Sequence, residues 1–73
     1  MNADTAKNLD KLQGMIDQTI DQLITQAQGS RAELLKEARL FVRIGREAIE
    51  AGDMDRAGRA FERALARVKE VAA

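Results

Sequence analysis

The side chains of this 73-residue sequence that could attack a substrate are few: one serine, three threonines and four lysines. Nucleophilic catalysis by serine needs a base that takes its proton, most often histidine, and the sequence contains no histidine and no cysteine. Ser30 follows Gly29 and precedes a helical apolar pattern, so its expected role is the N-cap of a helix. The sequence therefore predicts no catalytic residue and a protein that is not an enzyme.

The acidic residues form one run that looks like a cation site. The stretch from Asp53 to Gly58 begins as a calcium-binding loop does, but Ala57 stands where a third oxygen ligand belongs, and Ala64 replaces the bidentate glutamate. A helix N-cap at Asp53, with Asp55 in the first turn near the positive end of the helix dipole, explains the run. There is also no Gly-rich phosphate loop, so we expect no metal and no cofactor.

Overall charge and hydropathy limit the class of partner. Twelve basic and twelve acidic residues cancel at neutral pH, which disfavours a dedicated nucleic-acid-binding protein. Eight Arg against four Lys, with abundant Ala, are typical of a GC-rich bacterial genome. No apolar run approaches the roughly 20 residues of a transmembrane helix, and the first residues lack the features of a signal peptide. We expect a cytoplasmic protein with no membrane partner.

The elements that must position these side chains are helices. Apolar residues recur at intervals of three and four, with no Pro, and predict an all-α fold with helices over about residues 4–28, 31–51 and 53–72. In the pairs Gly29-Ser30 and Gly52-Asp53, Gly ends one helix and the next residue caps another, and Glu33 completes a capping box with Ser30. Joints this short force antiparallel neighbours. We therefore expect a single domain, a three-helix antiparallel bundle.

Residues 38–65 carry a further pattern of aromatic and small residues around a Gly-Asp turn. Its members are Phe41, Ile44, Gly45, Ala48, Gly52-Asp53, Ala57, Phe61, Ala64 and Leu65. In order and spacing, the pattern resembles one tetratricopeptide repeat (TPR), which implies a TPR-like hairpin preceded by a capping helix. Small residues let the two helices approach, and Phe41 and Phe61 fill the gaps. The chain departs from the family in having one copy, and in having Lys69 where a Pro usually stands.

Some apolar side chains lie outside the central stripe of their helix. The apolar arc of segment 31–51 spans roughly 220°, which is wider than one neighbouring helix covers. A lone repeat also leaves one of its faces unburied. We therefore expect self-association, as a homodimer or a higher oligomer, through Met15, Ile24, Leu40 and Ile44. In the alternative, the first helix folds across Leu40 and Ile44.

Basic residues form the remaining candidate surface. They share one side of each helix of the hairpin: Lys36, Arg39, Arg43 and Arg46 on the first, and Arg56, Arg59, Arg63 and Arg67 on the second. The simplest interpretation is a solvated face with intrahelical ion pairs, and the functional one is a surface for an acidic peptide or another helical protein. In the TPR family the first helix of a repeat lines the ligand groove, which here implies binding by Arg39, Val42, Arg46 and Ile49.

These patterns predict a protein–protein interaction or scaffolding module that self-associates through apolar helix faces. Two alternatives stay open. One is a small helical co-chaperone or antitoxin-like subunit that is stable only with a different protein. The other is a nucleic-acid-binding helical hairpin, which is disfavoured because no aromatic residue lies on the basic faces to stack on bases.

Overall fold

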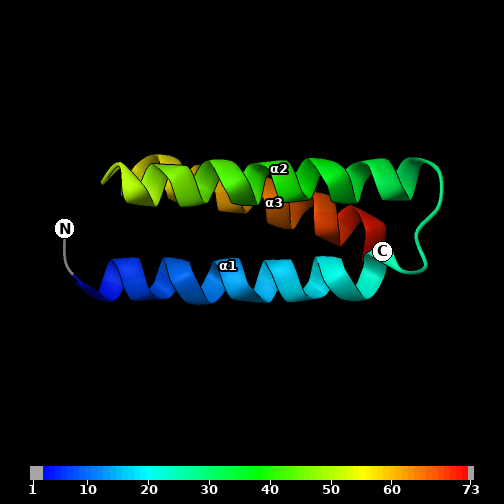
Figure 1. The fold of residues 1–73 in the computed structure, drawn as a ribbon, viewed down its shortest axis with the longest axis horizontal. Coiled ribbons are helices and arrows are strands. Elements are labelled where there is room, and N and C mark those ends of the chain that lie inside the picture. Colours follow the sequence, from blue (N-terminus) through cyan, green and yellow to red (C-terminus); the bar gives the residue numbers. More distant parts are fainter. Residues whose placement is uncertain (1–2, 73) are drawn as a thin grey trace.

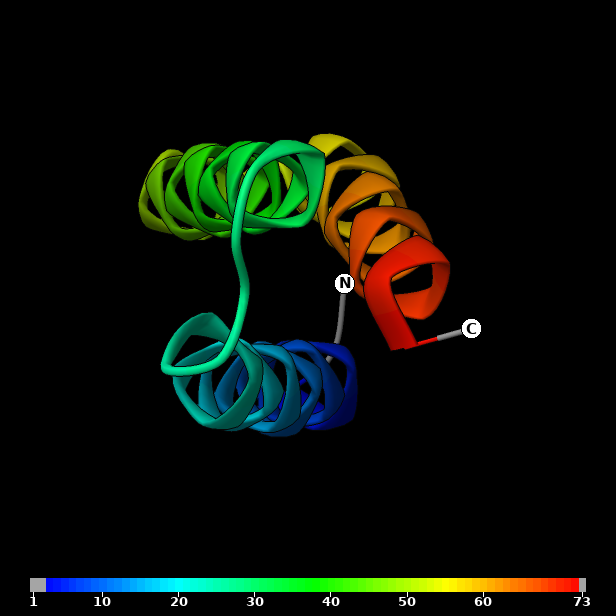
Figure 2. The ribbon, with the colours of Figure 1, turned by 90° about the vertical axis from the view of Figure 1, so that its right-hand side faces the viewer.

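The structure, a computed structural model, describes residues 3–72 and consists of three α-helices. They are α1 (Ala3–Ile24), α2 (Ser30–Glu50) and α3 (Met54–Ala72). Each helix contacts both of the others, and the interface between α2 and α3 is the most extensive. The chain reverses direction at both joints (Figure 1), and an end-on view shows the helices at the corners of a triangle (Figure 2). The predicted all-α, three-helix antiparallel bundle is confirmed.

The apolar stripes of the three helices meet in one core. Its largest fully buried side chains are Ile16, Ile20, Leu35, Val42 and Phe61, and no polar or charged side chain is buried among the described residues. Alanines of α2 and α3 complete it, namely Ala38, Ala48, Ala57 and Ala64. None of the three helices, over the residues described, is long and apolar enough to cross a membrane.

The α2–α3 interface depends on a glycine. Gly45 of α2 lies against the ring of Phe61 of α3, and a Cβ atom at position 45 would stand 2.4 Å from Cε1 of that ring. Carbon atoms do not approach so closely, so only glycine fits here without movement of the ring. The prediction that a small residue at position 45 allows close approach is confirmed. Phe61 is fully buried as expected, whereas Phe41 is only partly buried and packs against the core from its edge.

The joint between α2 and α3 has the predicted chemistry. Gly52 has a φ of 80°, its N–H donates to the carbonyl of Ile49 at 3.0 Å, and the N–H of Asp53 donates to the carbonyl of Ala48 at 2.8 Å. These two bonds form a Schellman motif, which satisfies the last carbonyls of α2. Asp53 then caps α3, because its Oδ1 accepts from the backbone N–H of Arg56 at 3.0 Å.

The joint between α1 and α2 differs from its prediction. The expected first helix reached residue 28, but α1 ends at Ile24, so the joint is longer than two residues. The Thr25 hydroxyl donates to the carbonyl of Gln22 at 3.1 Å, and the N–H of Gln26 donates to the carbonyl of Leu23 at 3.1 Å. Both bonds span three residues and replace the helical pattern, which explains the early end.

The predicted capping box at the start of α2 is also wrong. Ser30 is the first residue of α2 rather than its N-cap, and no side chain caps this helix. Gly29 is the N-cap, with φ 61° and ψ −129°, and its carbonyl accepts from the N–H of Glu33 at 3.2 Å. A positive φ of this kind has no steric cost for glycine. Gly29, and not Ser30 as predicted, is therefore the N-cap of α2.

Candidate interaction surface

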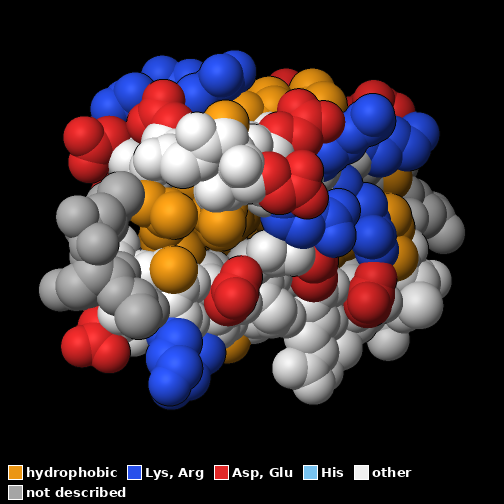
Figure 3. All heavy atoms as spheres, turned by 60° about the vertical axis from the view of Figure 1, so that its left-hand side comes forward, with side chains coloured by type: hydrophobic (Ala, Val, Ile, Leu, Met, Phe, Trp, Pro, Cys, Tyr) orange, Lys and Arg blue, Asp and Glu red, His pale blue; other side chains and the backbone are white. Residues whose placement is uncertain are grey.

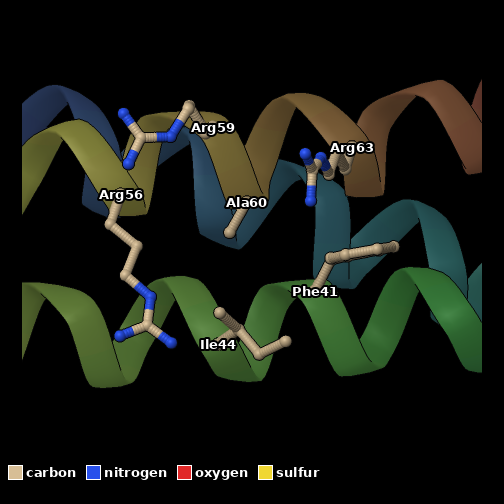
Figure 4. Close-up of a pocket in the computed structure, with 6 residues that line it drawn as sticks. All are labelled: Phe41, Ile44, Arg56, Arg59, Ala60 and Arg63. Carbon is tan, nitrogen blue, oxygen red and sulfur yellow. The ribbon is translucent and has the colours of Figure 1, made fainter.

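A groove of about 310 Å³ lies on the surface of the α2–α3 hairpin. Three apolar and three basic residues line it: Phe41, Ile44, Ala60, Arg56, Arg59 and Arg63. Figure 4 shows α2 and α3 on either side of this groove, with α1 behind them, so the groove opens away from α1. The side chain of Arg56 reaches from α3 toward α2, and Phe41 and Ile44 point from α2 toward α3.

Helical spacing and the register of the hairpin bring these residues together. On α2, Phe41 and Ile44 are three residues apart and therefore lie on one side of the helix. The contact of Gly45 with Phe61 fixes which residues of the two helices stand opposite each other. Because the helices are antiparallel, residues that precede Gly45 meet residues that follow Phe61. Phe41 accordingly lies beside Arg63 of the groove.

Two arginines stack on the aromatic ring at one end of the groove. The guanidinium carbon of Arg67 lies 5.3 Å from the centre of the Phe41 ring, and that of Arg63 lies 5.9 Å from it. These distances are within the range of cation–π interactions. Arg67 is also paired across the hairpin, with its Nε 3.8 Å from Oε2 of Glu37. The ring therefore has charged groups over it instead of a purely apolar surrounding.

The three arginines that line the groove have no anionic partner among the described residues. Within residues 3–72, the side chains of Arg56, Arg59 and Arg63 form no ion pair with a carboxylate. The space-filling view in Figure 3 shows basic and acidic side chains close to one another on the surface, with apolar atoms exposed between them. The groove thus combines apolar side chains with three arginines that pair with no carboxylate of the described residues.

The predicted self-association residues have separate positions. Leu40 is 54% exposed, and it lies one turn before Ile44, which is partly buried and lines the groove. The alternative in which the first helix covers Leu40 and Ile44 is therefore not what the structure shows. Met15 is 65% exposed but lies on α1, and Ile24 is partly buried against the core. Only Leu40 and Ile44 belong to the surface beside the groove.

The residues implied by the TPR resemblance lie on the side of α2 that meets α1. Val42 is fully buried, and Ile49 is packed against the core. The guanidinium of Arg39 donates a hydrogen bond to the carboxylate of Asp21 on α1. Arg46 and Ile49 line a smaller groove of about 180 Å³, together with Asp10 and Gln13 of α1. In this structure α1 occupies the face expected to receive a partner.

Sequence reasoning did not foresee the groove itself. It identified Arg56, Arg59 and Arg63 as one side of the third helix, and it placed Phe41 in the core. The register set by the contact of Gly45 with Phe61 could have revealed the groove, because this register places Phe41 beside the arginines of α3. Among residues 3–72, no group of three or more acidic side chains is placed to hold a metal ion.

Comparisons of the chain with protein families, with curated proteins and with solved structures find no match. The chemistry of the surface itself therefore carries the functional argument. That chemistry consists of apolar side chains in the groove, an exposed leucine next to it, and three arginines that form no ion pair within residues 3–72.

Proposed function

We propose that this chain is a cytoplasmic protein–protein interaction module without a catalytic role, and that it self-associates through the outer face of α2. One observation carries the proposal: Leu40 is 54% exposed in the middle of a helix, one turn from Ile44 at an open groove. On soluble proteins, adjoining apolar side chains at the surface mark an interaction site more often than scattered single ones do. A second copy of the chain buries both, and two-fold association is the commonest arrangement of soluble oligomers.

The resemblance of residues 38–65 to a TPR supports the same proposal. Units of this kind bury their faces by stacking on neighbouring units, and a single copy finds no such neighbour in its own chain. On the side facing α1, the first helix fills that place. On the groove side nothing in the described chain covers Leu40, so the missing neighbour is a second chain. Exposed Met15 on α1 offers a further contact for assemblies larger than a dimer.

Sedimentation equilibrium of the purified chain at about 100 µM tests this proposal, because a dimer of micromolar affinity is well populated at that concentration. We expect a dimer, and we expect Leu40→Glu to raise the dissociation constant at least about tenfold, because it places a charge in an apolar contact. Met15→Glu is the matched variant, because it changes an equally exposed apolar residue on a different helix. It should leave the dimer intact and remove only larger species.

A wild-type chain that remains monomeric under these conditions contradicts self-association. That result would favour the co-chaperone or antitoxin-like alternative, in which a different protein covers the same face. Circular dichroism of each variant confirms that a change in mass does not arise from loss of helix.

A further inference from the structure

The groove is flanked by glutamates of α2 on one side and is lined by arginines of α3 on the other. On α2, a glutamate–apolar stripe consists of Glu33, Glu37, Leu40, Ile44 and Glu47, spaced so that all lie on one side of the helix. On α3, an arginine row consists of Arg56, Arg59, Arg63 and Arg67, which are three or four residues apart. The 3.8 Å contact between Glu37 and Arg67 shows that the stripe and the row run side by side across the hairpin.

A surface with glutamates along one side of a groove and arginines along the other is complementary to a copy of itself. We propose that the occupant of the groove is a second copy of this chain, arranged about a two-fold axis so that α2 of each copy lies over α3 of the other. This inference rests on the proposed self-association and adds to it the relative placement of the helices. Each glutamate–apolar stripe then meets the arginine row of the other copy, and symmetry forms every such pair twice.

Charge selects this arrangement over the other face-to-face packing. If α3 lay over α3, the two arginine rows would oppose each other, and juxtaposed like charges disfavour an interface strongly. Arg56, Arg59 and Arg63 have no ion pair within residues 3–72, so they are available to carboxylates of a second copy. The glutamates of the stripe are accessible as well: the side chains of Glu33 and Glu47 are 71% and 65% exposed, and they pair only with Lys36 and Arg43 of the same helix.

The register of the hairpin specifies which charges meet. Gly45 stands opposite Phe61, so Glu47 lies near the level of Arg59 along the hairpin, and Glu37 lies near the level of Arg67. A two-fold axis parallel to the hairpin keeps these levels. Glu47 of one copy then faces Arg59 of the other, and Glu37 faces the end of the arginine row. Leu40 and Ile44 pack between arginine stems, whose methylene groups cover apolar surface while the charged ends pair.

A charge exchange between two variant chains tests the arrangement. The variant Arg59→Glu makes two carboxylates face each other where Glu47 of one copy meets residue 59 of the other, and Glu47→Arg makes two cations face each other there. We expect each variant alone to dimerise at least about tenfold more weakly than the wild type, because like charges now face each other. Mixed in equal amounts, the two variants should form a heterodimer of near wild-type affinity, since residue 47 of each copy again faces an opposite charge at residue 59 of the other.

The matched control is Lys7→Glu, which changes the net charge by the same amount as Arg59→Glu, at an exposed position of α1. It should leave the dissociation constant of the dimer within about threefold of wild type, because long-range charge is screened at physiological salt. Dimerisation that both groove variants leave unchanged, or a mixture of the two that forms no heterodimer, overturns this inference while leaving self-association standing. A monomeric wild type instead removes the proposed self-association itself.

Discussion

Helix α2 has two helical neighbours and meets them in different ways. Toward α3 it presents small residues, Gly45 and Ala48, and the ring of Phe61 fills the space that they leave. On α1, the side chains that enter the core are larger aliphatics, such as Ile16 and Ile20. The α2–α3 interface is the more extensive of the two. Small residues let backbones come close, and close backbones bring more of both helices into contact.

The two joints repeat this difference. The chain enters α3 through a Schellman motif and an aspartate cap, in which the backbone N–H groups of Gly52, Asp53 and Arg56 all have partners. It enters α2 through a longer joint, where Gly29 supplies the conformation and no side chain caps the helix. The hairpin is therefore specified both by its packing and by its turn, whereas the position of α1 depends mainly on the core contacts of its apolar stripe.

Removal of the Phe61 ring is expected to have the largest effect on this comparison. The side chain is fully buried, so Phe61→Ala should lower the free energy of unfolding by about 3–5 kcal/mol. That loss is comparable to the whole stability that one small core supplies. Phe41→Ala is the matched control, because this ring is only partly buried, and we expect a loss of about 1–2 kcal/mol. Urea unfolding at equal protein concentration measures both.

Equal losses from the two aromatic variants would contradict a hairpin centred on Phe61. They would mean that Phe41 is covered as fully as Phe61 in solution, for example by a second chain over the groove. Measurements at several protein concentrations separate these cases, because burial by a partner makes the apparent stability concentration-dependent.

Filling the space at Gly45 should have the next largest effect. The added methyl group of Gly45→Ala would meet the Phe61 ring, so we expect a loss of about 1–3 kcal/mol despite the better helix propensity of alanine. Gly58→Ala is the matched control within the same hairpin, since nothing lies within 4 Å of its added methyl group. It should stabilise the chain by about 0.5–1 kcal/mol. A stabilising Gly45→Ala would show that α2 and α3 are not in close contact here.

The α2–α3 hairpin, in which the helices pack more closely, is also the part of the fold that the sequence predicts best. Small residues, a Gly-Asp turn and an aromatic at fixed spacing predicted the hairpin, and its joint lies within one residue of the expected bounds. The end of α1 was missed because a threonine hydroxyl competes with the helix for one carbonyl. Such local competition involves small energies. The apolar pattern does not reveal it, because that pattern continues past the end of α1 to Ala27.

The candidate surface was predictable in its parts but not in its assembly. Leu40 and Ile44 stand off the central stripe of their helix, and the arginines of α3 share a side, as the sequence indicates. The structure adds that these features adjoin one another at the groove. The sequence also leaves open which side of the hairpin α1 covers. The side that α1 covers depends on its tertiary contacts, and in the structure Val42 lies in the core.

The two joints themselves give the last and smallest prediction. Asp53→Ala should cost about 1 kcal/mol of stability, because the N–H of Arg56 loses the carboxylate that accepts its hydrogen bond. Ser30→Ala should change stability by less than about 0.5 kcal/mol, because Ser30 lies inside the first turn of α2 and its side chain caps nothing. Urea unfolding resolves this difference when both variants are compared with wild type at one concentration. Should Ser30→Ala cost as much as Asp53→Ala, then Ser30 caps α2 in solution, α2 begins one residue later, and the contrast between the two joints disappears.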